Sequence, residues 1–347
     1  MKLGRILLFA LILIISISVS VSLVGAQDDL GSEANPIQVY FVPSAEAQAL
    51  ITGGEVLSEA LTAATGLNFE VSVPTSYAAT VEAMCADPGR SMGFIPALGY
   101  VVGNSRCGIE VNAAAVRFGW PVYWAQYVVR RDSDIYTFAD LDGRTWAYGD
   151  PGSTSGFLFP SIEMQDAGIT PGDTVETGGH GQTALAVYNG EADFGTTYYT
   201  PPLTPGGAWA IGDLPEPFDL TQEDSYTTVS DSGSTQLWVG DTRLLDARAS
   251  VAEQAPDIVD QVRILRLSTP IPNDTMSFGS DFPAELRTQI FDAIVAFSET
   301  EEWATSALGS SDGYEWTSLA PISDGDYDII RAQIDILGLS EEDIFGG

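Results

Sequence analysis

Short apolar runs and longer helical patterns alternate along this chain. The runs are rich in Val, Ile and aromatic residues and are bounded by Gly, Pro, Asn or Asp, as buried strands are. The stretches between them carry apolar residues at helical spacing, and several end at a glycine. This alternation predicts an α/β fold with parallel sheets and right-handed crossovers. The predicted strands span 37–43, 68–73, 91–95, 110–116, 121–130, 145–148, 174–177, 192–197, 236–239 and 262–267, and the predicted helices span 45–65, 77–86, 96–102, 138–143, 157–167, 182–189, 284–308 and 326–337.

One loop in this pattern carries the clearest candidate chemistry. The segment Asp150-Pro-Gly-Ser-Thr-Ser-Gly156 lies between a predicted strand and a predicted helix. Free backbone N–H groups and the dipole at a helix start favour an anion, and in open α/β sheets ligands bind at this end of the strands. Ser153, Thr154 and Ser155 can each add a hydroxyl donor. Because a helix cap needs only one hydroxyl, we interpret the loop as a grip for a tetrahedral oxyanion.

The start of the chain indicates where the protein works. Met1 to Arg5 is short and basic, Ile6 to Val24 is almost wholly apolar, and small residues end at Ala26. This order predicts a signal peptide over residues 1–26, cleaved after Ala26, and an extracytoplasmic protein, in the periplasm or on the outer face of the membrane. The alternative is an uncleaved membrane anchor, since the apolar stretch is long. Residues 27–35 are predicted to be a flexible N-terminus.

Composition narrows the partners of the protein. The formal net charge is −34, and Lys2 is the single lysine. Such acidity excludes nucleic acid and anionic lipid as favourable partners. An anionic ligand must therefore be attracted by local dipoles in a closed cleft, which can outweigh distant and screened surface charge.

The chain has two cysteines, Cys85 and Cys107. In a secreted protein two cysteines most simply form one disulfide, and a buried free pair is the alternative. A metal site needs more ligands than these cysteines and one histidine provide. We therefore expect neither a metal nor a cofactor.

The order of motifs along the chain resembles one family. The chain is similar to the substrate-binding proteins of ABC transporters for phosphonate, phosphite and phosphate, which have the type II periplasmic-binding-protein fold. The motifs that carry the resemblance are Pro96-Ala-Leu-Gly-Tyr100, Asp140-Leu-Asp-Gly143, Tyr148-Gly-Asp-Pro-Gly-Ser-Thr-Ser-Gly156, Gly178-Gly-His180, Asn189-Gly-Glu-Ala-Asp193 and Ser268-Thr-Pro-Ile-Pro272.

The resemblance implies two lobes around a cleft, each a mostly parallel sheet flanked by helices. Lobe 1 would comprise residues 36–128 plus 236–347, and lobe 2 residues 129–235. Hinges would lie near Val128-Val129 and Ser234-Thr235, and ligand would draw the lobes shut. The closed protein, expected to be a monomer, would then deliver a small phosphorus oxyanion to the permease subunits of an ABC importer.

The resemblance also implies site residues. Ser153, Thr154 and Ser155 match the oxyanion loop of the family, and His180 matches a histidine that contacts the same oxygens. Tyr77 and Tyr123 match aromatic positions that face the ligand, and Tyr100 is a further candidate. The chain departs from the aminoalkylphosphonate pattern in Gly195-Thr-Thr-Tyr-Tyr-Thr-Pro-Pro202, which has no carboxylate for a ligand ammonium. Phosphite, methylphosphonate or phosphate therefore fits better than a ligand with a cationic tail.

Two alternative functions follow from the same residues. The same fold can bind a sulfonate or a thiamine precursor, or serve as a sensor module. A hydrolase is the second alternative, because Gly152-Ser-Thr-Ser-Gly156 resembles the G-x-S-x-G nucleophile elbow. Its central residue is Thr154, and a triad would need His180 with an acid such as Asp166 or Asp173. We expect a binding protein and not an enzyme.

Overall fold

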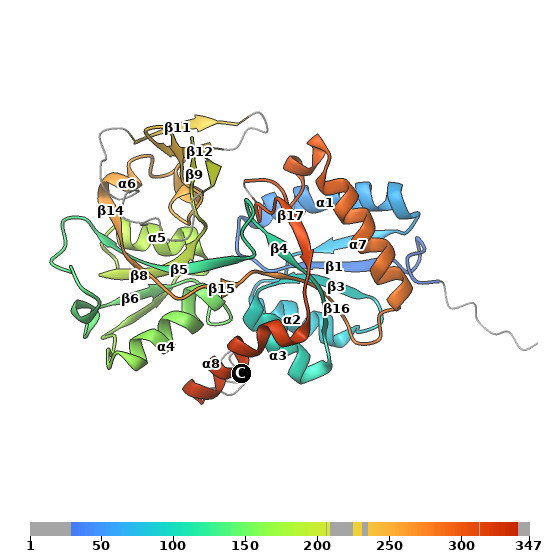
Figure 1. The fold of residues 1–347 in the computed structure, drawn as a ribbon, viewed down its shortest axis with the longest axis horizontal. Helices are drawn as coiled ribbons and strands as arrows, with labels where there is room; N and C mark the ends of the chain where they lie inside the picture. Colours follow the sequence, from blue (N-terminus) through green and yellow to red (C-terminus); the bar gives the residue numbers. More distant parts are fainter. Residues whose placement is uncertain (1–28, 206, 209–224, 231–234, 312, 339–347) are drawn as a thin grey trace, which may run out of the picture.

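The protein has two lobes that lie side by side (Figure 1), and each is built around one large sheet. The computed structural model describes residues 29–205, 207–208, 225–230, 235–311 and 313–338. The predicted signal peptide lies outside the described residues. Within the described part, no helix is both long enough and apolar enough to cross a membrane.

The first lobe is built on a sheet with the strand order β17-β4-β16-β3-β1-β2. Strand β1 alternates buried and half-buried residues, and helix α1 ends at Gly66 in the left-handed conformation (φ 74°), as the sequence predicts. The elements are β1 (Ile37–Phe41), α1 (Ala47–Thr65), β2 (Phe69–Ser72), α2 (Tyr77–Ala86), β3 (Ser91–Ile95), α3 (Ala97–Cys107), β4 (Glu110–Val116), β16 (Thr275–Phe278), α7 (Ala284–Ser298), β17 (Ser318–Pro321) and α8 (Asp328–Leu337).

The second lobe is built on a sheet with the order β14-β5-β8-β6-β7. Helices α4 and α5 pack in this lobe, and a π-helical turn at Thr154–Leu158 leads directly into α4. The elements are β5 (Val122–Arg130), β6 (Trp146–Tyr148), α4 (Phe159–Asp166), β7 (Thr174–Glu176), α5 (His180–Tyr188), β8 (Phe194–Tyr199), α6 (Ile258–Gln261) and β14 (Val262–Leu267).

A small antiparallel sheet extends the second lobe, with the order β10-β9-β13-β12-β11. Leu237 and Leu244 of this region share a buried cluster with Trp124 and Ile264 of the larger sheet, so the two sheets form one lobe. Of the strands of this sheet, the sequence predicts only the one over 236–239, which corresponds to β12. The strands are β9 (Leu203–Thr204), β10 (Gly207–Ala208), β11 (Ser225–Val229), β12 (Thr235–Val239) and β13 (Thr242–Arg243).

Strand pairing in both large sheets is mixed, whereas the sequence predicts mostly parallel sheets. Strand β1 is parallel to β2 and β3, but β16 and β17 run antiparallel to their neighbours. In the second lobe β6 is parallel to β7 and β8, while β5 is antiparallel to β8 and β14. Of these antiparallel strands, β5, β14 and β16 adjoin the connections between the lobes, and β17 follows α7 within the first lobe.

The lobe boundaries differ from the predicted ones. Val128 and Val129 lie in the middle of β5, which pairs with β8 and β14 and so belongs wholly to the second lobe. Thr235 begins β12 of the small sheet, and Ser234 lies outside the described residues. The chain passes between the lobes at residues 117–121 and 268–274, which we call the hinge segments. Strand β15 (Ile271–Pro272) pairs there with the start of β5.

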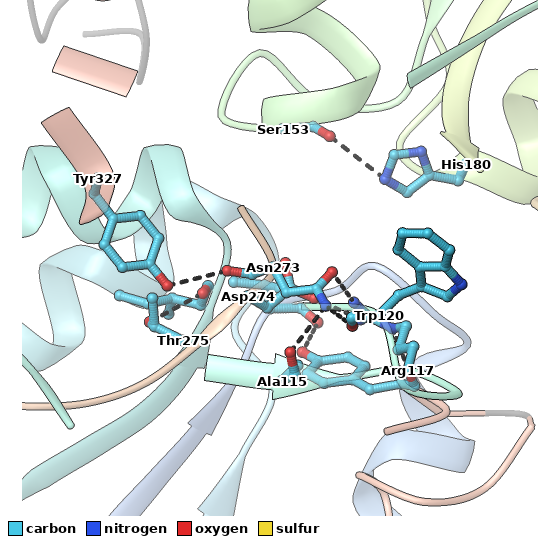
Figure 2. A network of polar contacts seen from close by, with 12 residues as sticks. Ala115, Arg117, Trp120, Ser153, His180, Asn273, Asp274, Thr275 and Tyr327 are labelled. Atoms are coloured by element: carbon cyan, nitrogen blue, oxygen red, sulfur yellow. Dashed lines mark hydrogen bonds and ion pairs between the residues drawn. The ribbon is translucent and has the colours of Figure 1, made fainter. Parts of the chain in front are cut away.

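Asn273 fastens the two hinge segments together (Figure 2). Its buried side-chain amide donates to the carbonyls of Ala115 (2.8 Å) and Trp120 (2.9 Å). The hydroxyl of Tyr327 donates to its carbonyl at 3.1 Å. These bonds connect the two hinge segments to each other and to Tyr327.

Two other predictions also need correction. Residues 29–35 of the predicted flexible N-terminus fold against the first lobe, because the N–H of Asn68 donates to the carbonyl of Gly31 at 2.7 Å and Leu30 packs on the core. The helix predicted over 284–308 ends at Ser298 and is followed by a separate 3-10 turn, Glu301–Thr305.

A disulfide joins Cys85 and Cys107, the pair that the sequence suggests, and ties α2 to α3. Helix α8 packs on α3 of the first lobe and on α4 of the second, on the lower side of the molecule in Figure 1.

Candidate functional site

A cavity of about 640 Å³ lies between the lobes. Several helices begin at its wall. Ala47 starts α1, Tyr77 starts α2, Pro96 precedes α3, Ser153 caps the π-helical turn and His180 starts α5. The N-terminal end of each helix carries a partial positive charge and N–H groups without an intrahelical acceptor. Their convergence explains how a strongly acidic protein can attract an anion.

The loop that the sequence singles out forms part of this wall. Ser153 and Ser155 line the cavity although each side chain is almost fully buried. Ser153 Oγ accepts from the N–H of Gly156 at 3.0 Å, so its one proton is available to another acceptor. Ser153 therefore serves as a helix cap and still presents a donor, which reconciles the two interpretations of the loop.

Glycines allow this loop to approach the loop before α5. A Cβ on Gly149 would lie 3.0 Å from the backbone carbon of Gly179. The N–H of Gly178 donates to the carbonyl of Gly149 at 2.8 Å, and Gly178 has a φ of 80°. Glycine is the residue that permits both the close contact and this φ. The approach brings His180 beside Ser153.

His180 is a buried and neutral imidazole. Burial lowers its pKa from 6.5 to about 4, although the carboxylate of Asp274 acts in the opposite direction. Its Nε2 lies 3.4 Å from Ser153 Oγ, and Tyr198 packs edge-on at 5.0 Å between ring centroids. Within the described part of the chain Nδ1 has no hydrogen-bond partner. A buried polar atom without a partner is costly, and a ligand could satisfy it.

The opposite wall carries an ion pair (Figure 2). Arg117 Nη2 lies 2.6 Å from Asp274 Oδ2, and its other nitrogens donate to Asn273 Oδ1 and to the carbonyl of Tyr314. Arg117 and Asp274 both line the cavity, so a guanidinium and a carboxylate face Ser153 and His180 across it.

Tyr77 and Tyr123 line the cavity, as expected from the sequence. Burial raises the pKa of each hydroxyl, so both remain protonated donors at neutral pH. The hydroxyl of Tyr123 hydrogen-bonds with Ser155 and Thr154, and its ring lies 5.9 Å from the Arg117 guanidinium carbon.

Thr154 and Tyr100 do not line the cavity. Thr154 is fully buried, and its Oγ1 accepts from the N–H of Leu98 at 3.0 Å. Tyr100 is also buried, and its hydroxyl donates to Asp324 at 2.6 Å. The expectation that these two side chains face a ligand is not supported by this geometry, because each polar group is already engaged elsewhere.

No hydrolase triad is assembled within the described residues. The Thr154 hydroxyl lies against Leu98 and Tyr123 and not against His180. Asp166 and Asp173 are exposed, and His180 Nδ1 has no carboxylate partner in the described part of the chain. Likewise, no group of His, Cys, Asp and Glu side chains there is arranged to hold a metal ion.

Sequence reasoning missed the acids and arginines of the cavity. The predicted absence of an acid holds for the segment 195–202 only, because carboxylates enter from other segments. Little in the sequence indicates these residues. Asp274, for example, lies two residues beyond the motif that ends at Pro272 and is not part of it. Three of the cavity carboxylates pair with arginines, as Asp274–Arg117, Glu315–Arg243 and Asp246–Arg248.

Comparison with known proteins identifies relatives over most of the chain. A family model described as "ABC transporter, phosphonate, periplasmic substrate-binding protein" matches residues 39–327. The phosphate-import protein PhnD of Mycolicibacterium smegmatis is 24% identical over 319 residues, which cover 87% of this chain and 86% of that protein.

Solved structures that share the fold include two phosphonate-binding proteins. A binding protein component of an ABC phosphonate transporter from Pseudomonas aeruginosa has a TM-score of 0.64 at 18% identity, covering 88% of this chain and 90% of the other. PhnD1 from Prochlorococcus marinus, in complex with methylphosphonate, has a TM-score of 0.63 at 12% identity, covering 87% and 98%.

Proposed function

The chain belongs to the periplasmic substrate-binding proteins of phosphonate ABC transporters, and we propose that it captures a small phosphorus oxyanion between Ser153, Ser155 and His180. Phosphonate, phosphite and phosphate are the candidate ligands. The observation that carries this proposal is the cavity at which helix N-termini, two serine hydroxyls and a neutral imidazole converge. Preorganised donors of this kind bind an anion without a fixed positive charge.

The relatives support this class of ligand. The name of the Mycolicibacterium protein specifies phosphate import, and the Prochlorococcus structure contains methylphosphonate. Delivery of the ligand to the permease of an ABC importer, a monomeric state and removal of residues 1–26 remain predictions. The absence of an enzymatic activity is also a prediction.

Asp274 favours phosphorus over sulfur oxyanions. With a second pKa of about 6, a phosphate group still carries that proton in part of its population near neutral pH, whereas a sulfate or sulfonate is fully ionised. The Asp274 carboxylate on the wall opposite Ser153 can accept that proton in a hydrogen bond and repels a fully ionised anion. The sulfonate alternative is therefore the less favoured one.

Calorimetric titration with phosphate, phosphite, methylphosphonate, aminoethylphosphonate, sulfate and taurine tests the proposal. We expect one or more of the first three to bind and sulfate and taurine to bind far more weakly. Tighter binding of taurine or sulfate than of every phosphorus oxyanion would contradict it.

A variant pair tests the role of Asp274. Asp274→Asn replaces a charged acceptor by a neutral amide, one of whose two groups donates, so the preference for phosphite over sulfate should fall about tenfold or more, the value of a hydrogen bond to a charged group. Glu315→Gln is the matched control, because it removes one negative charge from another arginine-paired acid of the cavity. An equal loss of preference in both variants would mean that net charge, and not the acceptor, sets selectivity.

A further inference from the structure

We propose that Thr154 is a positioning residue that latches the two lobes together, and not a contact of the ligand. The inference rests on the proposed capture of an oxyanion. Thr154 lies between Ser153 and Ser155, which both line the cavity, yet its own side chain has no exposed surface and does not line the cavity. The middle hydroxyl of the loop thus has a different environment from its neighbours.

The partner of Thr154 is on the other lobe. Its Oγ1 accepts from the N–H of Leu98 at 3.0 Å, and Leu98 is the second residue of α3. N–H groups in the first turn of a helix have no intrahelical acceptor. Thr154 therefore caps a helix of the first lobe from the second lobe, a bond that can exist only while the lobes are together.

A second contact of the same loop reaches the neighbouring helix. Asp150 Oδ2 accepts from the N–H of Tyr77, the first residue of α2, at 3.5 Å. The disulfide between Cys85 and Cys107 ties α2 to α3. Both contacts therefore act on one cross-linked unit of the first lobe, and the one from Thr154 is the shorter.

A latch of this kind changes affinity in a characteristic way. A ligand that binds only the closed protein has an apparent affinity reduced by the fraction of protein that is closed. Removing the Thr154 acceptor lowers that fraction whatever ligand is present. Affinity for every ligand should then fall by the same factor, about five- to tenfold for one hydrogen bond. Loss of a direct contact would change the affinities for different oxyanions unequally.

The test compares Thr154→Val, which keeps the shape but removes the hydroxyl and with it the bonds to Leu98 and Tyr123, with Thr154→Ser, which keeps the hydroxyl. Titrations with phosphite, phosphate and methylphosphonate should show a uniform loss for Thr154→Val, carried by faster dissociation, and near-normal binding for Thr154→Ser. Ser155→Ala is the contrasting variant, and its losses should differ from ligand to ligand. Unchanged affinity in Thr154→Val, or a changed order of ligand preference, would overturn the latch.

Hydrogen exchange of the wild-type protein gives an independent readout that needs no variant. Phosphite should slow exchange of the Leu98 amide much more than that of the neighbouring Ala97 amide. Equal protection of both amides would also overturn the latch. If no phosphorus oxyanion binds the wild-type protein at all, the proposed function fails and not the latch alone.

Discussion

His180 should make the stability of the ligand-free protein depend on pH. The imidazole is neutral in the folded protein because burial lowers its pKa from 6.5 to about 4. The unfolded chain binds the proton already near the ordinary pKa of histidine, so it is favoured as the pH falls below that value. Stability is therefore fully present above about pH 7 and declines as the pH drops toward 4.

The size of this effect follows from the shift. Between about pH 7 and pH 5 the free energy of unfolding should fall by about 2 kcal/mol on account of His180 alone. Carboxylates also titrate toward the acidic end of this range, but they do so in any variant. Because His180 is the single histidine of the chain, a variant without it isolates the contribution.

The assay is urea unfolding of the wild-type protein and of His180→Gln at intervals between about pH 5 and pH 7.5, the range around the histidine pKa. The wild-type protein should lose stability toward acid more steeply than the variant, by about 2 kcal/mol over that range. An NMR titration of the single imidazole should give a midpoint well below its ordinary value. Parallel pH dependence in the two proteins, together with an ordinary midpoint, would refute the buried neutral state of His180.

Three further predictions concern the frame of the site. Replacing Cys85 and Cys107 by serine should lower the free energy of unfolding by about 3 kcal/mol in urea denaturation, because the bond spans 22 residues; an unchanged midpoint would contradict this. Gly149→Ala should cost about 1–3 kcal/mol and weaken oxyanion binding, because its Cβ would press on Gly179; calorimetry and thermal unfolding measure both effects, and normal binding would count against the close approach. Phosphite at a hundred times its Kd should raise the free energy of unfolding by about 2.7 kcal/mol, whereas an equal rise with sodium chloride would indicate a general salt effect.

Much of the fold was predictable because its signals are local. Strands such as Ile37–Phe41 are buried runs, and helices such as α1 end at glycine. The hinge was not predictable, because the apolar pattern of β5 does not reveal that its partners are β8 and β14, far along the chain. Strand β16 has four residues, all buried, although two of them are polar. The sequence pattern therefore does not indicate a buried strand there.

The residues of the site also fall into those with local signals and those placed by distant parts of the chain. The place of Ser153 and Ser155 at the cavity wall was predictable, since one continuous loop and one helix start create their environment. Asp274 and Arg117 come from the two hinge segments, and only the order of strands in the sheets places them opposite that loop. Tyr100 was misplaced because its hydroxyl bonds to Asp324, a partner 224 residues away.

The central claim is that Ser153 and Ser155 hold the oxyanion. Calorimetric titration of Ser153→Ala/Ser155→Ala with phosphite and methylphosphonate tests it most directly, with Ser161→Ala, a serine of α4 outside this cavity, as the control. The account predicts at least about a hundredfold loss of affinity, since two hydrogen bonds to a charged group are removed, with the fold and the control unchanged. Binding by the folded double variant at wild-type affinity would contradict the account.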